Sequence, residues 1–344
     1  MVQGSEGNTS LPNYYRLRSR GGMFMLKRIA VMTSGGDSPG MNAAIRAVVR
    51  VAIHEGVEVW GIYNGYAGMY EDKMVKLESR SVGDILQRGG TFLGTARCEE
   101  FRTVEGRQQA FDNLQRHGIE GVVVIGGDGS MTGAEHLSKM GIAVVGLPGT
   151  IDNDIWGTDY TIGFDTATNT VVDAINKLRD TASSHGRVIV LEVMGRNSGW
   201  IAMTAGLAGG AEHILIPEMS VNLDELCQKL SQSRDSGKRY SVVVVAEGAG
   251  SAVEIGEKIV AATGLDTRVS VLGHIQRGGS PSVFDRILAS TLGEHATLGL
   301  ISGISDVMFG SRNGGVVTVD LADAIGHKRT IDPSMFRLGN LLSK

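Results

Sequence analysis

The sequence is poor in cysteine, in long apolar runs and in excess positive charge, and each shortage excludes a class of protein. Only two cysteines occur in 344 residues, Cys98 and Cys227, and their separation fits no metal or redox motif. No apolar run approaches the roughly 18 residues that a membrane span needs. The formal net charge of -4 lacks the basic excess typical of a general nucleic-acid surface. We therefore expect a cytoplasmic protein that binds neither a membrane nor nucleic acid.

The first 24 residues contain neither a periodic apolar face nor a continuous hydrophobic segment. This stretch is therefore not a secretory signal or a membrane anchor, and we predict a disordered N-terminal arm over residues 1–24. Met23 and Met25 come directly before the first predicted strand, which suggests the hypothesis that the natural start lies there.

Glycine, by contrast, is abundant. The chain has 49 glycines, against a usual share of about 7%, and they cluster after apolar runs. This pattern is typical of backbone that approaches ligands closely, because a residue without a Cβ leaves room for them.

Short β-rich runs alternate with longer stretches of helical period, as in residues 28–34 followed by 41–56. Such alternation predicts βαβ units and mostly parallel sheets covered by helices. The pattern restarts at Asp165, so we expect an α/β fold with two Rossmann-like lobes and the active site in the cleft between them. The predicted first lobe comprises residues 25–163 plus 276–325, and the second comprises 164–275 plus 326–344.

The stretch "TSGGDSPGMNAAI", Thr33 to Ile45, is a glycine-rich turn between a strand and a helix. Such a turn can offer bare N–H groups and a helix N-terminus to a phosphate. It is not a Walker A motif, and it lacks the GxGxxG spacing. An ordinary α/β turn in which glycine only supplies geometry fits this stretch equally well.

The stretch "GGDGS", residues 126–130, follows a second apolar strand. Its three glycines clear space, while Asp128 supplies one hard oxygen ligand of the kind that Mg²⁺ prefers in nucleotide sites. A plain Asp-Gly turn is the alternative.

The stretch "PGTIDND" carries the strongest single signal. Thr150, Asp152 and Asp154 alternate, so in an extended loop they project to the same side. Two carboxylates so close repel each other unless a cation or a substrate proton lies between them. The loop therefore indicates a metal site or a general base, with a surface turn as the alternative.

Arginines and other polar groups also follow predicted strands, and several converging arginines could form a sugar-phosphate pocket. Each one could instead be a solvated surface side chain, and His274 could be a core histidine. The set is Arg97, Arg187, Arg196, Glu247, Arg268, His274 and Arg277.

Taken together, "TSGGDSPGMNAAIR", "RGGTFLGTAR", "VVIGGDGS", "GLPGTIDNDI", "LEVMGR" and "VLGHIQRGGSP" closely resemble the bacterial ATP-dependent 6-phosphofructokinase family. The likeness runs from Lys27 to about Asp323, with the motifs in order. "GGDG" alone also suits diacylglycerol kinase and NAD kinase relatives, but "PGTIDND" and "GHIQRGG" do not belong there.

The resemblance implies roles for individual residues in phosphoryl transfer from ATP to the 1-hydroxyl of fructose 6-phosphate. Asp152 would take the proton of that hydroxyl, Thr150 and Asp154 would orient the hydroxyl and the metal, and Arg196 would stabilise charge on the moving group. Asp128 would reach Mg²⁺. The first lobe would bind ATP through Gly36, Tyr66, Arg97, Cys98, Arg102, Gly127, Asp128, Gly129 and Ser130, with Gly36 and Arg97 near the transferred group. The second lobe would bind the sugar phosphate through Met194, Gly195, Arg196, Glu247, His274 and Arg277, with Arg187 and Arg268 reaching across from a neighbouring subunit.

The resemblance also implies a homotetramer, activated by ADP or GDP and inhibited by phosphoenolpyruvate at a second site. The residues that match that site are Arg46, Arg50, Arg179, Glu212 and Lys238. Two positions depart from the family pattern, because Ser79 stands where an arginine is common and Ser236 replaces a usual lysine. Fewer cations should weaken anion binding there.

The phosphoryl donor can be argued from two glycines. Pyrophosphate-using relatives carry Asp at the position of Gly129 and Lys at that of Gly149, and a carboxylate at 129 would repel an α-phosphate. The sequence therefore favours ATP, with a pyrophosphate-dependent enzyme as one alternative. A catalytically silent nucleotide-sensing subunit is another, although Asp128, Asp152, Asp154 and Arg196 are all present.

Overall fold

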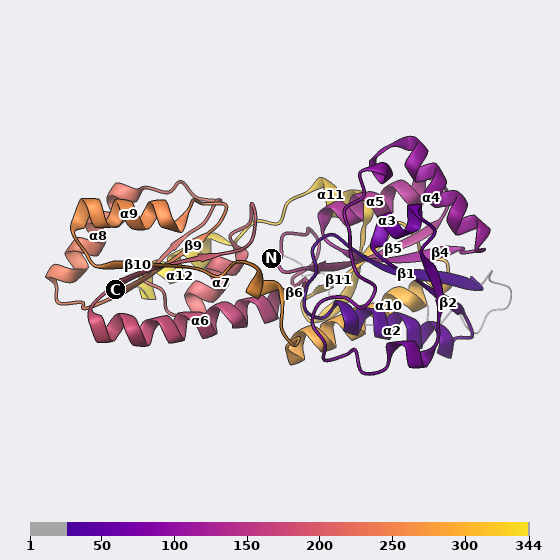
Figure 1. Cartoon of the computed structure of the whole chain (residues 1–344), viewed down its shortest axis with the longest axis horizontal. Coiled ribbons are helices and arrows are strands. Elements are labelled where there is room, and N and C mark those ends of the chain that lie inside the picture. Colours follow the sequence, from indigo (N-terminus) through magenta and orange to yellow (C-terminus); the bar gives the residue numbers. More distant parts are fainter. Residues whose placement is uncertain (1–25, 343–344) are drawn as a thin grey trace, which may run out of the picture.

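A computed structural model describes residues 26–342, and the predicted N-terminal arm with its two candidate start methionines lies outside them. The described chain folds into two mostly parallel β-sheets flanked by helices, which lie side by side along the long axis of the molecule (Figure 1). The predicted α/β fold class is therefore confirmed. No helix among residues 26–342 is both long enough and apolar enough to cross a lipid bilayer.

The larger sheet has eight strands in the order β12-β11-β5-β4-β1-β2-β3, with β6 paired to β5. Its central pairs are parallel, and only the β2–β3 and β11–β12 pairs are antiparallel. The strands are β1 (Arg28–Ser34), β2 (Glu58–Ile62), β3 (Met74–Leu77), β4 (Gly121–Gly126), β5 (Ala143–Thr150), β6 (Ile162–Gly163), β11 (Val307–Arg312) and β12 (Gly315–Asp320).

The smaller sheet has four parallel strands in the order β10-β7-β9-β8. Its strands are β7 (Val188–Val193), β8 (His213–Leu215), β9 (Ser241–Ala246) and β10 (Thr267–Val271).

Helices cover both sheets on both faces (Figure 1). The α-helices are α2 (Met41–His54), α3 (Gly65–Tyr70), α4 (Val104–Arg116), α5 (Asp128–Lys139), α6 (Phe164–His185), α7 (Trp200–Ala208), α8 (Leu223–Asp235), α9 (Ala252–Thr263), α10 (Val283–Ile301), α11 (Leu321–Gly326) and α12 (Pro333–Leu342). Three short 3₁₀ helices are η1 (Ser79–Val82), η2 (Glu100–Arg102) and η3 (Gly273–Arg277).

The central strands read as continuous apolar runs because both of their faces are buried. In β1, Ile29 and Val31 join the core under α2 and α10, whereas Ala30 and Met32 join the core on the opposite face. In the smaller sheet, β9 divides its valines in the same way between the two cores that flank it. The strand ends are thereby held rigidly, which fixes the loops that follow them.

The chain passes between the sheets near residues 163, 280 and 330. The last passage returns to the smaller sheet, where α12 packs against α7 and β8 through Met335 and Phe336. The C-terminal stretch therefore forms a helix that contacts the second sheet. The residue boundaries of the two lobes stay a prediction.

Candidate functional site

The acid loop, residues 151–155, leaves the carboxyl end of β5 directly after Thr150. The Asp152 backbone N–H donates to the Thr150 hydroxyl oxygen at 3.2 Å. Asp152 is 4% exposed, and its Oδ1 atom has no hydrogen-bond partner in the described structure. Because a buried polar atom without a partner is costly, this oxygen indicates a place for a ligand.

Two carboxyl groups of the acid loop have raised pKa values. Burial raises the pKa of Asp152, and the nearby Arg277 and Arg196 oppose that rise. Burial, with the charges of Asp152 and Asp128, raises the pKa of Asp154 to about 6. The site therefore holds carboxyls whose ionised forms repel one another until a cation or a proton joins them.

The loop's shape depends on Asn153, which lies between the two acids. Its φ of 52° is in the left-handed region, where Asn is tolerated better than most residues. The Asn153 side-chain oxygen accepts a hydrogen bond from the Thr161 N–H at 2.9 Å, and the Thr161 hydroxyl donates to the Thr150 carbonyl at 2.6 Å. From the smaller sheet, the Ser198 hydroxyl donates to the Asp152 carbonyl at 3.1 Å.

Arg196 comes from the loop that follows β7 in the smaller sheet. Its φ is 53°, and the Glu247 carboxylate holds this turn by accepting from the N–H groups of Gly195 and Arg196 at 3.1 and 2.7 Å. The Arg196 Nε atom lies 3.9 Å from Asp152 Oδ2, while its side chain remains 67% exposed. Residues that follow strands of the two sheets thus meet at one point.

The "GGDGS" stretch turns from β4 into α5, so Asp128, Gly129 and Ser130 form the first turn of that helix. A Cβ added at Gly127 would lie 3.6 Å from the Cβ of Thr150, which places this turn beside the acid loop. A Cβ at Gly129 would meet nothing within 4 Å. The turn therefore presents a helix N-terminus to open space, an arrangement that favours phosphate binding.

Tyr66 lies under this helix N-terminus. Its hydroxyl donates to the Ser130 carbonyl at 2.6 Å, and its ring stacks on Phe101 at 4.2 Å between centroids. Burial raises the pKa of Tyr66 well above its ordinary value, so the hydroxyl stays protonated. Tyr66 thus stabilises the first turn of α5 through its hydrogen bond to Ser130.

The first glycine-rich turn follows β1, the strand next to β4. Arg277 fills the space beside Gly36 so closely that a Cβ there would collide with the guanidinium. The same guanidinium donates to the Asp37 carbonyl at 3.2 Å. Thr95 fixes the other side of the turn, because its hydroxyl donates to the Gly35 carbonyl at 2.7 Å.

The loop that begins at Thr95 carries the other residues predicted on the nucleotide side. Arg97 is exposed, and Arg102 is paired with Glu99 at 3.3 Å on the surface. Cys98 is partly buried, which raises the pKa of its thiol. The structure therefore places this loop against the Gly35 turn, with its cations facing solvent.

The residues predicted for the sugar side cluster at the carboxyl ends of β7, β9 and β10. They are Met194, Gly195, Arg196, Glu247, His274 and Arg277. His274 is exposed, so the alternative of a core histidine is wrong. Gln276, which the sequence analysis did not single out, is fully buried and accepts a hydrogen bond from the Met194 N–H at 3.2 Å.

Arg187 and Arg268 are not brought to this cluster. Arg187 precedes β7 and Arg268 lies near the start of β10, so both are at the opposite end of the smaller sheet. They share Asp266, with nitrogen–oxygen distances of 2.6 and 2.5 Å, and the Arg187 hydrogen bond is the largest cause of the lowered pKa of that acid. A strand of six residues separates them from Arg196, a distance of roughly 20 Å.

The residues predicted for an effector site fall into two groups. Arg46 and Arg50 lie on α2, which packs against α10. Arg179, Glu212 and Lys238 gather at the smaller sheet, where Lys238 Nζ lies 3.4 Å from Glu212 Oε1 and Arg179 donates to the Gly210 carbonyl at 2.7 Å. Within one chain, the structure therefore assembles only part of the set.

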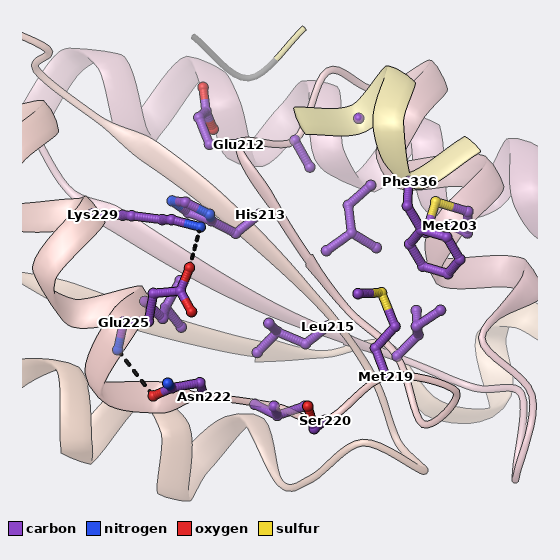
Figure 2. A pocket seen from close by; sticks show the side chains of 16 residues that line it. Met203, Glu212, His213, Leu215, Met219, Ser220, Asn222, Glu225, Lys229 and Phe336 are labelled. Atoms are coloured by element: carbon purple, nitrogen blue, oxygen red, sulfur yellow. Dashed lines mark hydrogen bonds and ion pairs between the residues drawn. The ribbon is translucent and has the colours of Figure 1, made fainter. Parts of the chain in front are cut away.

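A pocket lies along β8, between α8 and α12 (Figure 2). Its apolar wall includes Met203, Leu215 and Phe336, and its polar side carries the Lys229–Glu225 ion pair at 2.7 Å. Glu212 is the only predicted site residue that lines it. This pocket is therefore separate from the acid loop.

The donor set at the acid loop suits a hard divalent cation. In the described residues, no three His, Cys, Asp or Glu side chains come close enough to form an all-protein metal cage. Mg²⁺ does not need one, because it is usually held by one or two carboxylates together with phosphates and water. The charges of Asp128 and Asp152, which help to raise the pKa of Asp154, fit such an ion beside them.

Comparisons with known proteins agree with this geometry. A family model described as Phosphofructokinase matches residues 28–300. A Bacillus pumilus protein named ATP-dependent 6-phosphofructokinase is 59% identical over 318 residues, which cover 92% of this chain and 100% of the relative.

Solved structures agree as well. The structure of phosphofructokinase from Saccharomyces cerevisiae matches with a TM-score of 0.83 and 38% identity over 92% of this chain, which spans 48% of the yeast chain. A pyrophosphate-dependent phosphofructokinase from Marinobacter aquaeolei matches with a TM-score of 0.81 over 89% of this chain and 86% of its own. At 24% identity, that second likeness shows the fold alone.

Proposed function

This chain belongs to the phosphofructokinase family, and on that premise we propose that it is an ATP-dependent 6-phosphofructokinase. It transfers the γ-phosphoryl group of Mg-ATP to the 1-hydroxyl of fructose 6-phosphate, giving fructose 1,6-bisphosphate and ADP. The observation that carries the proposal is the buried, unpartnered Oδ1 of Asp152, placed beside Arg196 and next to the open helix N-terminus at Gly129.

Asp152 is the proposed general base. Burial raises its pKa, which makes the ionised carboxylate a better proton acceptor than an exposed aspartate. Its free oxygen accepts the proton of the sugar hydroxyl as that hydroxyl attacks phosphorus, while Thr150 and Asp154 orient the hydroxyl.

Arg196 and Arg277 neutralise charge on the transferred group, with Gly36 and Arg97 beside it. Phosphoryl transfer needs positioning and charge neutralisation more than covalent chemistry from the protein. Gly36 lets the Arg277 guanidinium lie against the backbone, where its charge also opposes the rise in the pKa of Asp152.

ATP binds against the two glycine-rich turns. The N-terminus of α5 with Gly127, Gly129 and Ser130 meets the phosphates, and the loop with Arg97, Cys98 and Arg102 lies on the nucleotide side, where Tyr66 supports the turn. Asp128 is the proposed Mg²⁺ ligand, and Asp154 would help to orient the ion. When bound, Mg²⁺ offsets the phosphate charge and polarises the transferred group.

Fructose 6-phosphate binds at the carboxyl ends of the smaller sheet, through Met194, Gly195, Arg196, Glu247, His274 and Arg277. Arg187 and Arg268 lie too far from Arg196 to reach the same sugar within one chain, so in the homotetramer that the family resemblance implies they would act across a subunit boundary. A neighbouring subunit would supply them.

Effector control by ADP, GDP and phosphoenolpyruvate is proposed at the site that Arg179, Glu212 and Lys238 begin. Arg46 and Arg50 would complete it from another subunit. Ser79 and Ser236 lower the number of cations there, so we expect weak anion binding. A cytoplasmic location stays a prediction from composition.

Gly129 supports ATP over pyrophosphate as the donor. Since a Cβ at Gly129 meets nothing within 4 Å, an aspartate fits the protein and places its charge where the nucleotide phosphates bind. Gly149 is tighter, because a Cβ there lies 3.0 Å from Ile125 Cγ2 and 3.1 Å from Met41 Cε. We expect Gly129→Asp to abolish ATP use and Gly129→Ala to keep it, and ATP activity in the aspartate variant would contradict this explanation.

The decisive experiment supplies the purified protein with fructose 6-phosphate and either Mg-ATP or Mg-pyrophosphate. We expect turnover with Mg-ATP only, and none in an Asp152→Ser variant. Turnover with pyrophosphate alone favours the pyrophosphate-dependent enzyme. Turnover with neither donor favours a silent nucleotide-sensing subunit.

A further inference from the structure

The connection between α11 and α12 runs from the larger sheet back to the smaller one (Figure 1). On the way it passes beside the acid loop. Three consecutive residues make the contact, and we call residues 327–329 the crossing segment. The His327 ring lies 5.5 Å from the Trp156 ring, and Lys328 forms an antiparallel backbone bridge with Ile155. Arg329 Nη1 donates to the Asn153 carbonyl at 3.2 Å. The crossing segment therefore runs antiparallel beside residues 153–156.

Arg329 also touches the other half of the site. Its guanidinium carbon lies 4.0 Å from the centroid of the Trp200 ring, within the range of a cation–π contact. Trp200 is 9% exposed and begins α7, directly after the loop that carries Arg196. The Arg329 side chain is thus in contact with both sides of the reaction centre.

These two contacts bear on the geometry of the reacting groups. The carbonyl that Arg329 holds belongs to Asn153, whose left-handed backbone sets the direction in which Asp152 and Asp154 leave the loop. Trp200, whose ring Arg329 covers, lies two residues after Ser198. The Ser198 hydroxyl donates to the Asp152 carbonyl. Arg329 is half-buried, and burial lowers its pKa, but a guanidinium remains charged at physiological pH.

We propose that Arg329 is a positioning residue for phosphoryl transfer, because it holds the Asn153 carbonyl and the Trp200 ring together and thereby sets the spacing between Asp152 and Arg196. In the described structure, no hydrogen bond or ion pair joins Arg329 to the Asp152 carboxylate or to the Arg196 guanidinium. Arg329 therefore acts on these groups through the backbone. The inference rests on the proposed function.

The test compares Arg329→Ala with the matched control Lys328→Ala. Lys328 is the neighbouring cation, with an exposed side chain and a backbone bridge that the alanine keeps. We expect Arg329→Ala to lower kcat by about 10- to 100-fold, since small displacements of reacting groups are that costly, with KM for ATP changed less than about twofold. Lys328→Ala should retain wild-type kcat. Arg329→Lys, which keeps the charge but not the planar fork, should fall between them.

Chemical rescue separates positioning from a structural role. Guanidinium chloride at low millimolar concentration should restore part of kcat in Arg329→Ala and leave Lys328→Ala unchanged, with sodium chloride as the ionic-strength control. If Arg329→Ala does not fold, Arg329→Lys takes its place in the test. A kcat below that of Lys328→Ala with a nearly unchanged KM for ATP supports the inference, and a wild-type kcat overturns it.

The inference is overturned if the wild-type protein turns over and folded Arg329→Ala keeps kcat within about twofold. It is also overturned if the loss follows the folded fraction, measured by circular dichroism, and guanidinium restores nothing. Absence of wild-type turnover overturns the proposed function, and the positioning role with it.

Discussion

Asp152 in the acid loop and Asp285 at the start of α10 are both buried carboxyls, yet their surroundings differ. Asp285 is fully buried and accepts hydrogen bonds from the Gly163 N–H, the Thr166 N–H and the Thr166 hydroxyl at 2.8, 2.8 and 2.5 Å. Asp152 is almost as buried, but its Oδ1 has no partner. The first carboxyl is satisfied by the protein, whereas the second is left for a ligand.

The satisfied carboxyl has a structural task. Asp285 joins the first residues of α6, which leads into the smaller sheet, to α10, which packs on the larger one. Gly163 is also paired with Thr150 at the end of β5. Asp152 is therefore expected to serve the reaction, whereas Asp285 is expected to stabilise the fold.

The largest effect is expected for Asp152→Asn. Loss of a general base should lower kcat by about 10²- to 10⁴-fold in a steady-state assay. The urea midpoint should stay the same or rise, because the substitution removes a buried charge without a full set of partners. A kcat within tenfold of wild type would assign the proton transfer to another group.

The reverse pattern is expected for Asp285→Asn. An amide offers one acceptor oxygen and a competing donor to three donors, so we expect a loss of about 4 kcal/mol in the free energy of unfolding. Urea denaturation measures it, and kcat of the folded fraction should fall far less than in Asp152→Asn. A variant that unfolds like wild type would show that these hydrogen bonds do not hold the junction.

A smaller effect concerns pH. Burial raises the pKa of Asp285 from 3.8 to about 6, so between these values the folded state keeps a proton that the unfolded state releases. The stability that this proton provides is present below about pH 4 and lost as the pH rises to 6, by less than about 3 kcal/mol.

The measurement is the difference in unfolding free energy between wild type and Asp285→Asn at pH 4 to 8. This subtraction cancels the other titrating groups. The difference should decrease from pH 4 to pH 6 and stay level above, and a difference that grows with pH would reverse the assigned shift.

The smallest effect is expected for Ser282→Ala. The Ser282 hydroxyl accepts from the Asp285 N–H at 3.1 Å and donates to Asp165 Oδ2 at 2.6 Å. Loss of this N-cap should cost about 1 kcal/mol in thermal or urea unfolding. Thr103→Ala removes a comparable N-cap from α4, away from the junction. If Ser282→Ala costs far less in unfolding than Thr103→Ala does, the Ser282 N-cap does not support the junction.

The sequence allowed the fold class and the grouping of the main site residues to be predicted, because apolar runs ending in glycine and acid mark the carboxyl ends of parallel strands. The spacing of Asp152 and Asp154 could be read directly. The β11–β12 hairpin was missed, although its Asn313-Gly314 turn, with φ of 51° and 76°, is a known hairpin signal.

The long-range contacts of other residues could not be predicted from the sequence. The N-cap pattern from Ser282 to Asp285 is readable, but nothing local says that Asp285 would reach Gly163, 122 residues away. Arg329 lies outside every motif, and only the return of the chain brings it to Asn153. Contacts of this kind depend on how distant segments pack, which periodicity does not report.

The close approach of Arg277 to Gly36 has a consequence for how this protein can vary. The two positions lie on different segments, yet any side chain at 36 has to displace the guanidinium that also holds the Asp37 carbonyl. Because the guanidinium is the end of a flexible side chain, it can shift at little cost, so a substitution at 36 would move a cation of the site without unfolding either segment.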